Sequence, residues 1–302
     1  MSQQIVNFIS LGSMYAVVAI GFSLYFGTAN LINFAHGDLC TLAAFLLLLF
    51  VSLLHSMFPD AGLLTFMAAV ILSMIACSAI GVISERILFR PIRNRPILEG
   101  LIISLAFSMV IRESILHFYP NGGNPQAFWT PFQLGHLHVL GANIAYVQVA
   151  LVAICIALAA LFFWIVKFTR FGLSMRATAQ DPEAATMIGI RVDRTIAIAF
   201  AVGAAFAAVA GILSGAVYGS VKFDMGFGLG IKGFAAAVIG GLDSPNGAFL
   251  GGMLLAAMEV AIVALVPGGS AYRDSVAFVL LIVVLLLRPS GMLSTKREFS
   301  IR

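Results

Sequence analysis

Apolar stretches of about 20 residues recur along this chain, and they constrain its fold more than any other feature. A helix of that length crosses the roughly 30 Å hydrocarbon core of a bilayer. Inside that core every backbone amide must be bonded within its own segment, which favours helices. Charged residues make up 10% of the 302 positions, against about 25% in soluble domains. The sequence therefore predicts an all-α polytopic membrane protein.

Eight stretches are long enough to span a membrane, and one further stretch, 231–241, is too short to cross unaided. The predicted spans are residues 5–26, 39–58, 61–83, 98–118, 145–166, 195–218, 248–266 and 270–287. The first lacks a basic region before it and is too long for a cleaved signal peptide, so it is interpreted as a span. We expect one transmembrane domain over residues 1–302, with about eight spanning helices and short broken or re-entrant helices.

Most of the 17 Lys and Arg residues gather in the regions 86–95, 167–194 and 288–302. The positive-inside rule places these regions, including the C-terminus, in the cytoplasm. Topology then explains the net charge of +4 without a nucleic-acid partner.

No Lys or Arg precedes Arg86. Either the N-terminus is outside, or residues 27–38 form a short crossing and the N-terminus is inside. Residues 119–144 form the external loop, expected to be a structured cap.

For the second and third basic regions to lie on the same side, the chain must cross the membrane once more than its long spans provide. Three of these spans separate the second and third basic regions, and an odd number would place those regions on opposite sides. The short stretch 231–241 restores the balance if it enters from outside and turns within GGLDSPNG (240–247). Gly240 and Gly241 suit such a turn. A turn at membrane depth must be buried in protein or line a wet cavity.

A second interruption, GTANLINFAHGDL (27–39), places Asn30, Asn33, His36 and Asp38 between two apolar stretches. Interrupted helices in corresponding positions of two halves are typical of a transport path. These side chains are therefore expected to bond a helix break or to line a water-filled path. Alternatively, Asp38 caps a span that starts at Leu39.

Isolated charges also occur inside the apolar stretches. Glu259 has no basic residue within a turn or two, so it either serves the path or bonds across helices. Arg112 and Glu113 point about 100° apart on a helix, and each is expected to bond a neighbouring helix or a headgroup.

The small residues of 195–218 predict close helix packing. Cys40, Cys77 and Cys155, and His136 with His138, show no metal-site spacing.

The segment 170–194 contains a short helix with marked ends. Asp181 is a favourable N-cap, Pro182 fits the first helical position, and Gly189 is a natural stop. Such a helix either inserts into a groove on another protein or lies on lipid headgroups. The run from Glu183 to Gly189 reads E-A-A-x-x-x-G. It resembles the cytoplasmic coupling loop of ABC-importer permeases, which docks on an ATP-binding subunit.

Three motifs extend this resemblance to most of the chain, about residues 5–290. They are LINFAHGDL (31–39), MRATAQDPEAATMIGIRVDR (175–194) and GFAAAVIGGLDSPNGAFLGG (233–252). In this order they resemble the membrane subunits of branched-chain amino-acid ABC importers, in particular the shorter of two permease subunits. The resemblance assigns ATPase coupling to one set of residues: Arg176, Asp181, Pro182, Glu183, Ala184, Ala185 and Gly189.

The resemblance also implies partners and a location. It implies a second homologous permease, two ATP-binding subunits, a soluble substrate-binding protein and the inner membrane of a prokaryote. The cargo would be branched-chain amino acids, or urea or short amides in the same kind of machine. The chain has no P-loop, so ATP is expected to be used by partner subunits, with no cofactor bound here and no enzymatic activity. The rival hypotheses are an autonomous secondary transporter or channel, with ion coupling at Glu259 or Asp38, and a non-transporting scaffold.

Overall fold

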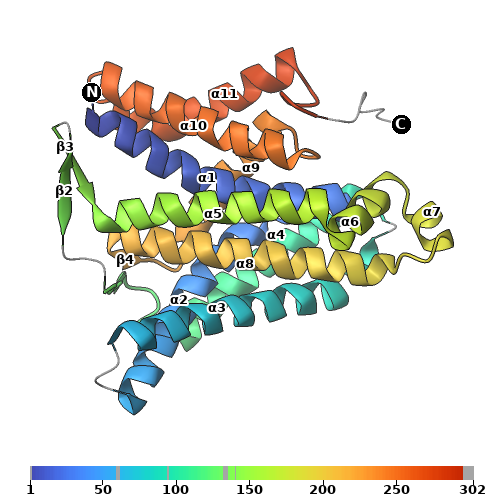
Figure 1. Cartoon of the computed structure of the whole chain (residues 1–302), viewed down its shortest axis with the longest axis horizontal. Helices are drawn as coiled ribbons and strands as arrows, with labels where there is room; N and C mark the ends of the chain where they lie inside the picture. The colour runs from blue at the N-terminus through green and yellow to red at the C-terminus, as the bar shows by residue number, and fades with distance from the viewer. Residues whose placement is uncertain (1, 59–61, 94, 132–134, 140, 295–302) are drawn as a thin grey trace.

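A computed structural model of the chain describes residues 2–58, 62–93, 95–131, 135–139 and 141–294. In these residues, 8 helices are long and apolar enough to cross a membrane. They form a bundle with two small two-stranded sheets at one end (Figure 1). The prediction of an all-α polytopic membrane protein with about eight spans and an additional short helix is confirmed.

The spanning helices follow the predicted stretches closely. They are α1 (Ser2–Ala29), α2 (Ala35–Met57), α3 (Gly62–Ser84, continued to Ile92), α4 (Ile97–Phe118), α5 (Tyr146–Phe168), α8 (Val192–Tyr218), α10 (Pro245–Leu265) and α11 (Arg273–Leu287, preceded by a turn from Gly269). The shorter helices are α6 (Arg170–Gln180), α7 (Pro182–Met187) and α9 (Met225–Gly240). The strands are β1 (Gln126–Ala127), β2 (His136–Val139), β3 (Ala142–Ala145) and β4 (Ser220–Val221).

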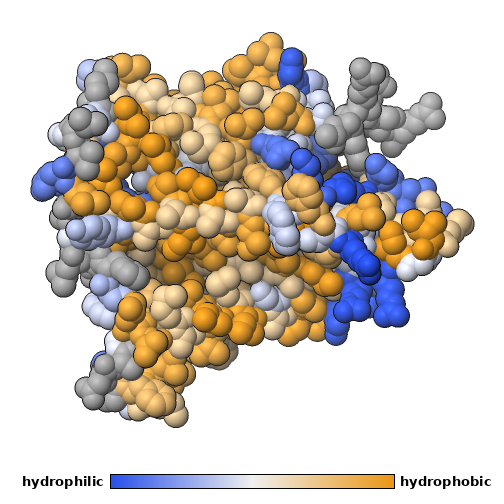
Figure 2. Space-filling view, viewed as in Figure 1, coloured by the Kyte–Doolittle hydropathy of each residue, from blue (hydrophilic) through white to orange (hydrophobic). Residues whose placement is uncertain are grey.

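The bundle has two chemically different ends. One, which we call the basic end, carries α6 and α7, and on the face drawn in Figure 2 most of the strongly hydrophilic side chains lie there (Figures 1 and 2). There Arg90 and Arg93 both bond Asp193 at the start of α8. The other, which we call the loop end, carries the strands. Strands β2 and β3 pair antiparallel, with His136 opposite Ala145 and Val139 opposite Ala142.

The N-terminus lies at the loop end. The backbone amide of Asn143, in β3, donates to Oε1 of Gln3 at 2.9 Å. Helix α1 therefore runs from the loop end to the basic end in one pass, as Figure 1 shows. The segment 27–38 is consequently not a separate crossing: the last turn of α1 and the first turn of α2 flank a short break at residues 30–34, which decides between the two alternatives for the N-terminal half.

Helix α9 supplies the extra reversal that the charge pattern requires. It has 16 residues and is about 24 Å long at 1.5 Å per residue. Just before it, Ser220 of β4 pairs with Ala127 of β1 at the loop end. At its other end, the carbonyl of Ile239 accepts from Met292 N at 2.9 Å, beyond the end of α11. Helices α8 to α11 thus return the chain to the basic end.

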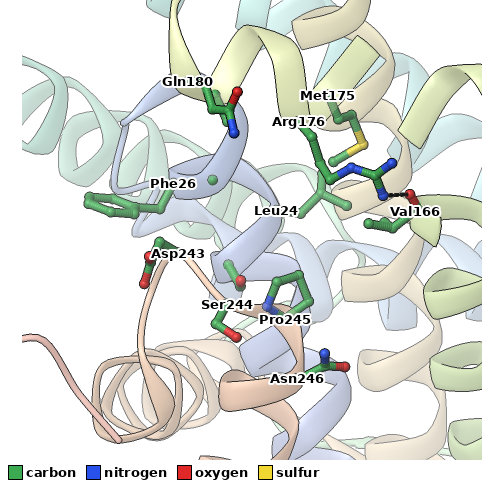
Figure 3. A pocket seen from close by; sticks show the side chains of 13 residues that line it. Leu24, Phe26, Val166, Met175, Arg176, Gln180, Asp243, Ser244, Pro245 and Asn246 are labelled. Atoms are coloured by element: carbon green, nitrogen blue, oxygen red, sulfur yellow. Dashed lines mark hydrogen bonds between the residues drawn. The ribbon is translucent and has the colours of Figure 1, made fainter. Parts of the chain in front are cut away.

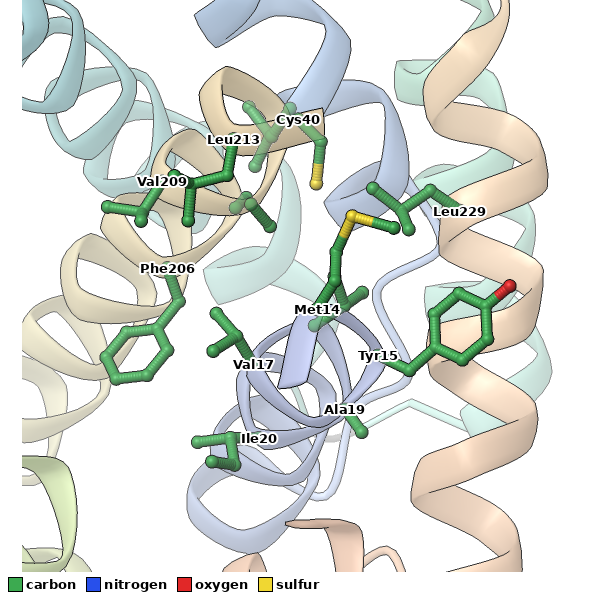
Figure 4. Packing of buried hydrophobic residues seen from close by; sticks show 14 of the residues in the cluster. Met14, Tyr15, Val17, Ala19, Ile20, Cys40, Phe206, Val209, Leu213 and Leu229 are labelled. Carbon is green, nitrogen blue, oxygen red and sulfur yellow. The ribbon is translucent and has the colours of Figure 1, made fainter. Parts of the chain in front are cut away.

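Helices α1 and α8 form the centre of the bundle. Figure 4 shows Val17 and Ile20 of α1 packing toward Phe206 of α8, all three buried. The peripheral helices instead present apolar side chains outward: Ile102 of α4 is 64% exposed, and Leu286 of α11 is 78% exposed. Exposed leucine and isoleucine are stable only against lipid or another apolar surface, as expected for a membrane-spanning bundle.

The small residues of α8 allow close backbone approach, as the sequence predicts. A Cβ added at Gly203 would lie 2.5 Å from the Tyr25 ring of α1. One added at Gly211 would lie 1.9 Å from the carbonyl oxygen of Cys40 in α2. Since lipid gives no hydrophobic drive for helix association, such contacts carry much of the packing energy.

Gly211→Ala should therefore destabilise the bundle. The added methyl meets the α2 backbone, which must move, and overpacking of this kind costs about 1–3 kcal/mol of unfolding free energy. We expect a lower midpoint of thermal denaturation in detergent, read by fluorescence-detected size-exclusion chromatography. Gly62→Ala is the control, because a Cβ there meets nothing within 4 Å. Equal midpoints for the two variants would contradict this account of α8 packing.

Candidate functional site

The short helix α7 begins as its sequence predicts. Oδ1 of Asp181 accepts from the backbone amides of Glu183 at 2.9 Å and Ala184 at 3.0 Å. Pro182 occupies the first helical position, where its missing N–H costs nothing. The negative side chain of Glu183 lies in the first turn, where the helix dipole favours it.

The end of α7 is equally well defined. Gly189 has φ +87°, a left-handed conformation that favours glycine. The amide of Ile190 donates to Ala185 O, and that of Gly189 donates to Thr186 O, both at 3.0 Å. These bonds form a Schellman motif, which satisfies carbonyls left free at a helix end.

Helix α7 presents an apolar tip to its surroundings. Met187 is 86% exposed and Ile188 is 75% exposed, whereas Ala185 is buried against the rest of the chain. Figure 1 shows α7 at the extreme basic end, beyond the ends of the spans. A capped helix therefore holds two large apolar side chains at the outermost point of this end.

Helix α6 connects α7 to the bundle. Thr169 caps it, accepting from Gly172 N at 3.2 Å. The guanidinium of Arg176 donates to the carbonyl of Val166 in the last turn of α5 (Figure 3). Met175 and Thr178 are buried against the bundle. Helix α6 therefore links α7 directly to the end of α5.

A cavity of about 450 Å³ lies beneath α6, and we call it the junction cavity. Phe26 and Gly27 line it from α1, and Arg176 and Gln180 line it from α6. In Figure 3 the residues from Asp243 to Asn246 face α6 from the opposite side. A Cβ on Gly27 would lie 3.9 Å from Asp243 O. The last turn of α1, the α9–α10 turn and α6 therefore meet at this one place.

The turn between α9 and α10 uses its glycines as predicted. Gly241 has φ +114°. A Cβ on Gly240 would lie 1.9 Å from Gly247 O, so the two helices touch through their backbones. Ser244 caps α10, accepting from Gly247 N at 3.2 Å. The turn lies beside Gln180 at the basic end, where both line the junction cavity.

The interruption before α2 is built from asparagines. Asn30 has φ +52° and ends α1 with its amide bonded to Phe26 O at 2.9 Å. Asn33 is fully buried, and its Oδ1 accepts from Ala35 N at 3.1 Å. Helix α2 therefore starts at Ala35, and Asp38 lies inside its first turn. The alternative in which Asp38 caps a span starting at Leu39 is wrong, because Asn33 already binds the first amide of the helix.

Asp38 and His36 connect helices instead of lining the junction cavity. Asp38 is buried, accepts from the Ser108 hydroxyl of α4, and lies 3.7 Å from Nε of Arg112. The Arg112 guanidinium stacks over the ring of Phe227 in α9, 5.0 Å from its centroid. His36 is fully buried, with its ring centroid 4.9 Å from that of Phe22 in α1. These polar groups thus join the start of α2 to α1 and α4, and through Arg112 to α9.

The expectation for Arg112 is confirmed by these interhelical contacts, whereas Glu113 contacts a residue of its own helix. Its carboxylate lies 3.4 Å from Nδ1 of His117, one turn along the same helix. Both side chains are exposed, so an i, i+4 pair forms without a neighbouring helix.

Glu259 lies at the centre of an ion network between helices. It is fully buried and lies 3.0 Å from Nζ of Lys232 in α9 and 3.5 Å from Nε of Arg273 in α11. The Tyr15 hydroxyl of α1 donates to its Oε2 at 3.1 Å. Lys232 also lies 2.7 Å from Oδ1 of Asp274. Glu259 therefore bonds across helices, one of the two roles that the sequence left open.

Sequence reasoning named Glu259 without its partners. A signal for them existed, since Lys232 is the one charged residue within the apolar helix α9. A single cation in an intramembrane helix predicts an acidic partner on another helix. What the sequence could not supply was the packing that brings α9, α10 and α11 together.

Comparison with known proteins identifies relatives over nearly the whole chain. The family model described as "branched-chain amino acid transport system / permease component" matches residues 4–285. The permease protein LivH of the high-affinity branched-chain amino acid transport system of Escherichia coli K12 is 36% identical over 294 residues, covering 96% of this chain and 94% of LivH. BraD of Pseudomonas aeruginosa PAO1, from a system of the same description, is 36% identical over 293 residues, covering 96% and 95%.

A more distant relative matches one part of the chain. The autoinducer 2 import system permease protein LsrC of Escherichia coli O157:H7 is 30% identical over 154 residues, which are 49% of this chain and 44% of LsrC.

Glu259→Ala should weaken the bundle strongly. It leaves the Tyr15 hydroxyl without an acceptor and removes the anion between Lys232 and Arg273. We expect a loss of about 2–4 kcal/mol in unfolding free energy, seen as a lower thermal midpoint in detergent. Glu113→Ala is the control, since an exposed pair contributes about 1 kcal/mol or less. A Glu259→Ala protein as stable as the control would refute the structural role of the network.

Proposed function

This chain belongs to the family of branched-chain amino acid transport system permease components, and we propose that it is the membrane-spanning subunit of an ATP-driven importer. The proposed cargo is a branched-chain amino acid. ATP would be hydrolysed by two separate subunits that bind the basic end, which is then cytoplasmic. A second homologous permease and a soluble substrate-binding protein, delivering cargo at the loop end, would complete the machine.

One observation carries the proposal: α6, which leads directly into the exposed helix α7, borders the junction cavity together with the last turn of α1 and the α9–α10 turn. Met187 and Ile188 offer an apolar tip suited to a groove on a partner protein. Behind them, α6 is bonded to the end of α5 and faces the α9–α10 turn across the cavity. A displacement of α7 would therefore pass through α6 to the end of α1 and to the α9–α10 turn, where the chain is interrupted.

The cavity gives the coupling step room to occur. Packed interiors are bistable and not continuously deformable, so a coupling movement needs a second position for the element that moves. With about 450 Å³ between them, α6 and the residues from Asp243 to Asn246 can approach when the ATP-binding subunits close. Since Gly27 lies beside Asp243, the same movement would reach the end of α1. Alternating access would then follow from ATPase closure.

Buried charges do not favour the rival secondary transporter. Asp38 is matched by Arg112, and Glu259 is matched by Lys232 and Arg273. Uptake in cells that lack the ATP-binding subunits decides the issue, because a secondary transporter would retain it. For the cargo, uptake competition between leucine, urea and acetamide separates the amino-acid hypothesis from the urea or short-amide alternative.

Met187→Glu should uncouple the permease from its ATPase. Burial of a methionine side chain is worth about 1.5–3 kcal/mol, and a carboxylate in the same groove adds a desolvation cost. We expect at least about tenfold less ATP-binding subunit to co-purify and loss of ATP-driven uptake, with an unchanged thermal midpoint. Met57→Glu, at an exposed methionine of the loop end, is the control. Normal co-purification of Met187→Glu would contradict docking through α7.

Ala179→Trp should block coupling without preventing assembly. Ala179 lines the junction cavity, so an indole there occupies the space between α6 and the α9–α10 turn. We expect ATP-binding subunits to co-purify normally while uptake falls severalfold. Leu173→Trp adds the same ring to α6 outside the cavity, at a side chain 60% exposed. If both variants transport alike, the cavity takes no part in coupling.

A further inference from the structure

A second cavity, at the loop end, has a lining that differs from that of the junction cavity. It measures about 490 Å³ and lies between α1, α8, α9 and the start of α11. Small-molecule sites typically occupy about 300–1,000 Å³. It is close to the Glu259 network, since Tyr15, Lys232 and Asp274 line it. None of the residues assigned to coupling takes part in it.

The cavity carries charges of both signs. Lys222 is exposed, and its side-chain ammonium forms no ion pair or hydrogen bond with any residue that the structure describes. Asp274 is 74% exposed and uses Oδ1 to bond Lys232, so its Oδ2 can accept from a further cation. Lys232 is 19% exposed and is balanced on its inner side by Glu259. The cavity therefore offers a ligand the unpaired ammonium of Lys222 and the second carboxylate oxygen of Asp274.

The inner wall between these charges is apolar. Met14 and Leu229 are buried at 5% and 8% exposure, and Met225 is half-buried. Figure 4 shows Met14 projecting from α1 toward Leu229 of α9. Methionine adapts to apolar groups of different shape because its side chain is flexible and polarisable. An apolar group of a few carbons fits this wall.

We propose that this cavity binds the zwitterionic form of an α-amino acid with an apolar side chain, an inference that rests on the proposed function. The carboxylate of the ligand would bond Lys222, and its ammonium would bond Oδ2 of Asp274. Its side chain would lie against Met14, Met225 and Leu229. The pair of Glu259 and Lys232 would hold Asp274 in position. Urea and simple amides carry neither charge, so the cavity selects against them.

Charge-deleted ligands test each contact separately. Leucine has both charged groups, 4-methylpentanoate lacks the ammonium, and isopentylamine lacks the carboxylate. The experiment measures equilibrium binding of each radiolabelled compound to the purified complex of permeases and ATP-binding subunits, with the substrate-binding protein left out. Lys222→Gln should weaken leucine and 4-methylpentanoate about tenfold each. Asp274→Asn should weaken leucine and isopentylamine similarly but leave 4-methylpentanoate unaffected.

Two controls separate binding from folding. Lys222→Arg keeps the cation and should keep the affinity, while Glu113→Gln removes an exposed carboxylate of the loop end outside the cavity and should change nothing. Because Lys222 has no described partner, its loss is not expected to lower the thermal midpoint. If Asp274→Asn proves unstable, Lys222→Gln alone still decides the proposal.

The outcomes distinguish this site from the proposed function. Unchanged leucine binding in Lys222→Gln, or no saturable binding to the wild-type complex at millimolar leucine, overturns the site. ATP-driven leucine uptake by the wild-type complex, reconstituted in vesicles together with the substrate-binding protein, would leave the proposed importer intact. Absence of any ATP-dependent uptake by a complete transporter would instead defeat the proposed function.

Discussion

Backbone contact at glycines is the constraint on which the rest of the structure depends. Helix α2 meets α9 where a Cβ on Gly37 would lie 2.3 Å from Gly226 O, and Thr41 Oγ1 accepts from Gly226 N at 2.8 Å. Helix α9 meets α10 through Gly240 and Gly247. In lipid, where apolar side chains gain nothing by leaving solvent, such approach is a main source of helix association. The short helix α9 can therefore sit between α2 and α10, although few of its residues are large.

This placement of α9 explains why both interruptions exist. Helix α9 has 16 residues, and it must reach from the β1–β4 pair to the basic end. The connection that follows it is therefore short. It turns at once through Gly241 and Ser244 into α10. Likewise α2 must begin beside Gly226, so the chain leaves α1 through Asn30 and turns back over Asn33. Each break lies next to a place where two helix backbones are in contact: the first leads to Gly37 beside Gly226, and the second lies between Gly240 and Gly247.

The elements that could be predicted from the sequence are those set by local chemistry. Long apolar runs define spans, and the Asp181 to Gly189 helix carries both of its caps in its own residues. The parity of basic regions even predicted the extra reversal by α9. The start of α2 at Ala35 was missed because a buried asparagine, Asn33, substitutes for a cap that the sequence assigned to Asp38. The junction cavity could not be predicted from the sequence either, because it depends on how α1, α6 and the α9–α10 turn pack together.

Pairing of the intramembrane charges has a consequence for energy coupling. A carboxylate that exchanges protons or ions during transport must alternate between a bound and a free state. Asp38 is held by Ser108 and Arg112, and Glu259 is held by Tyr15, Lys232 and Arg273. Releasing either group would leave a buried charge unpaired, at a cost of several kcal/mol. Energy for transport is therefore better supplied from outside these helices, through the exposed tip of α7, than by titration within them.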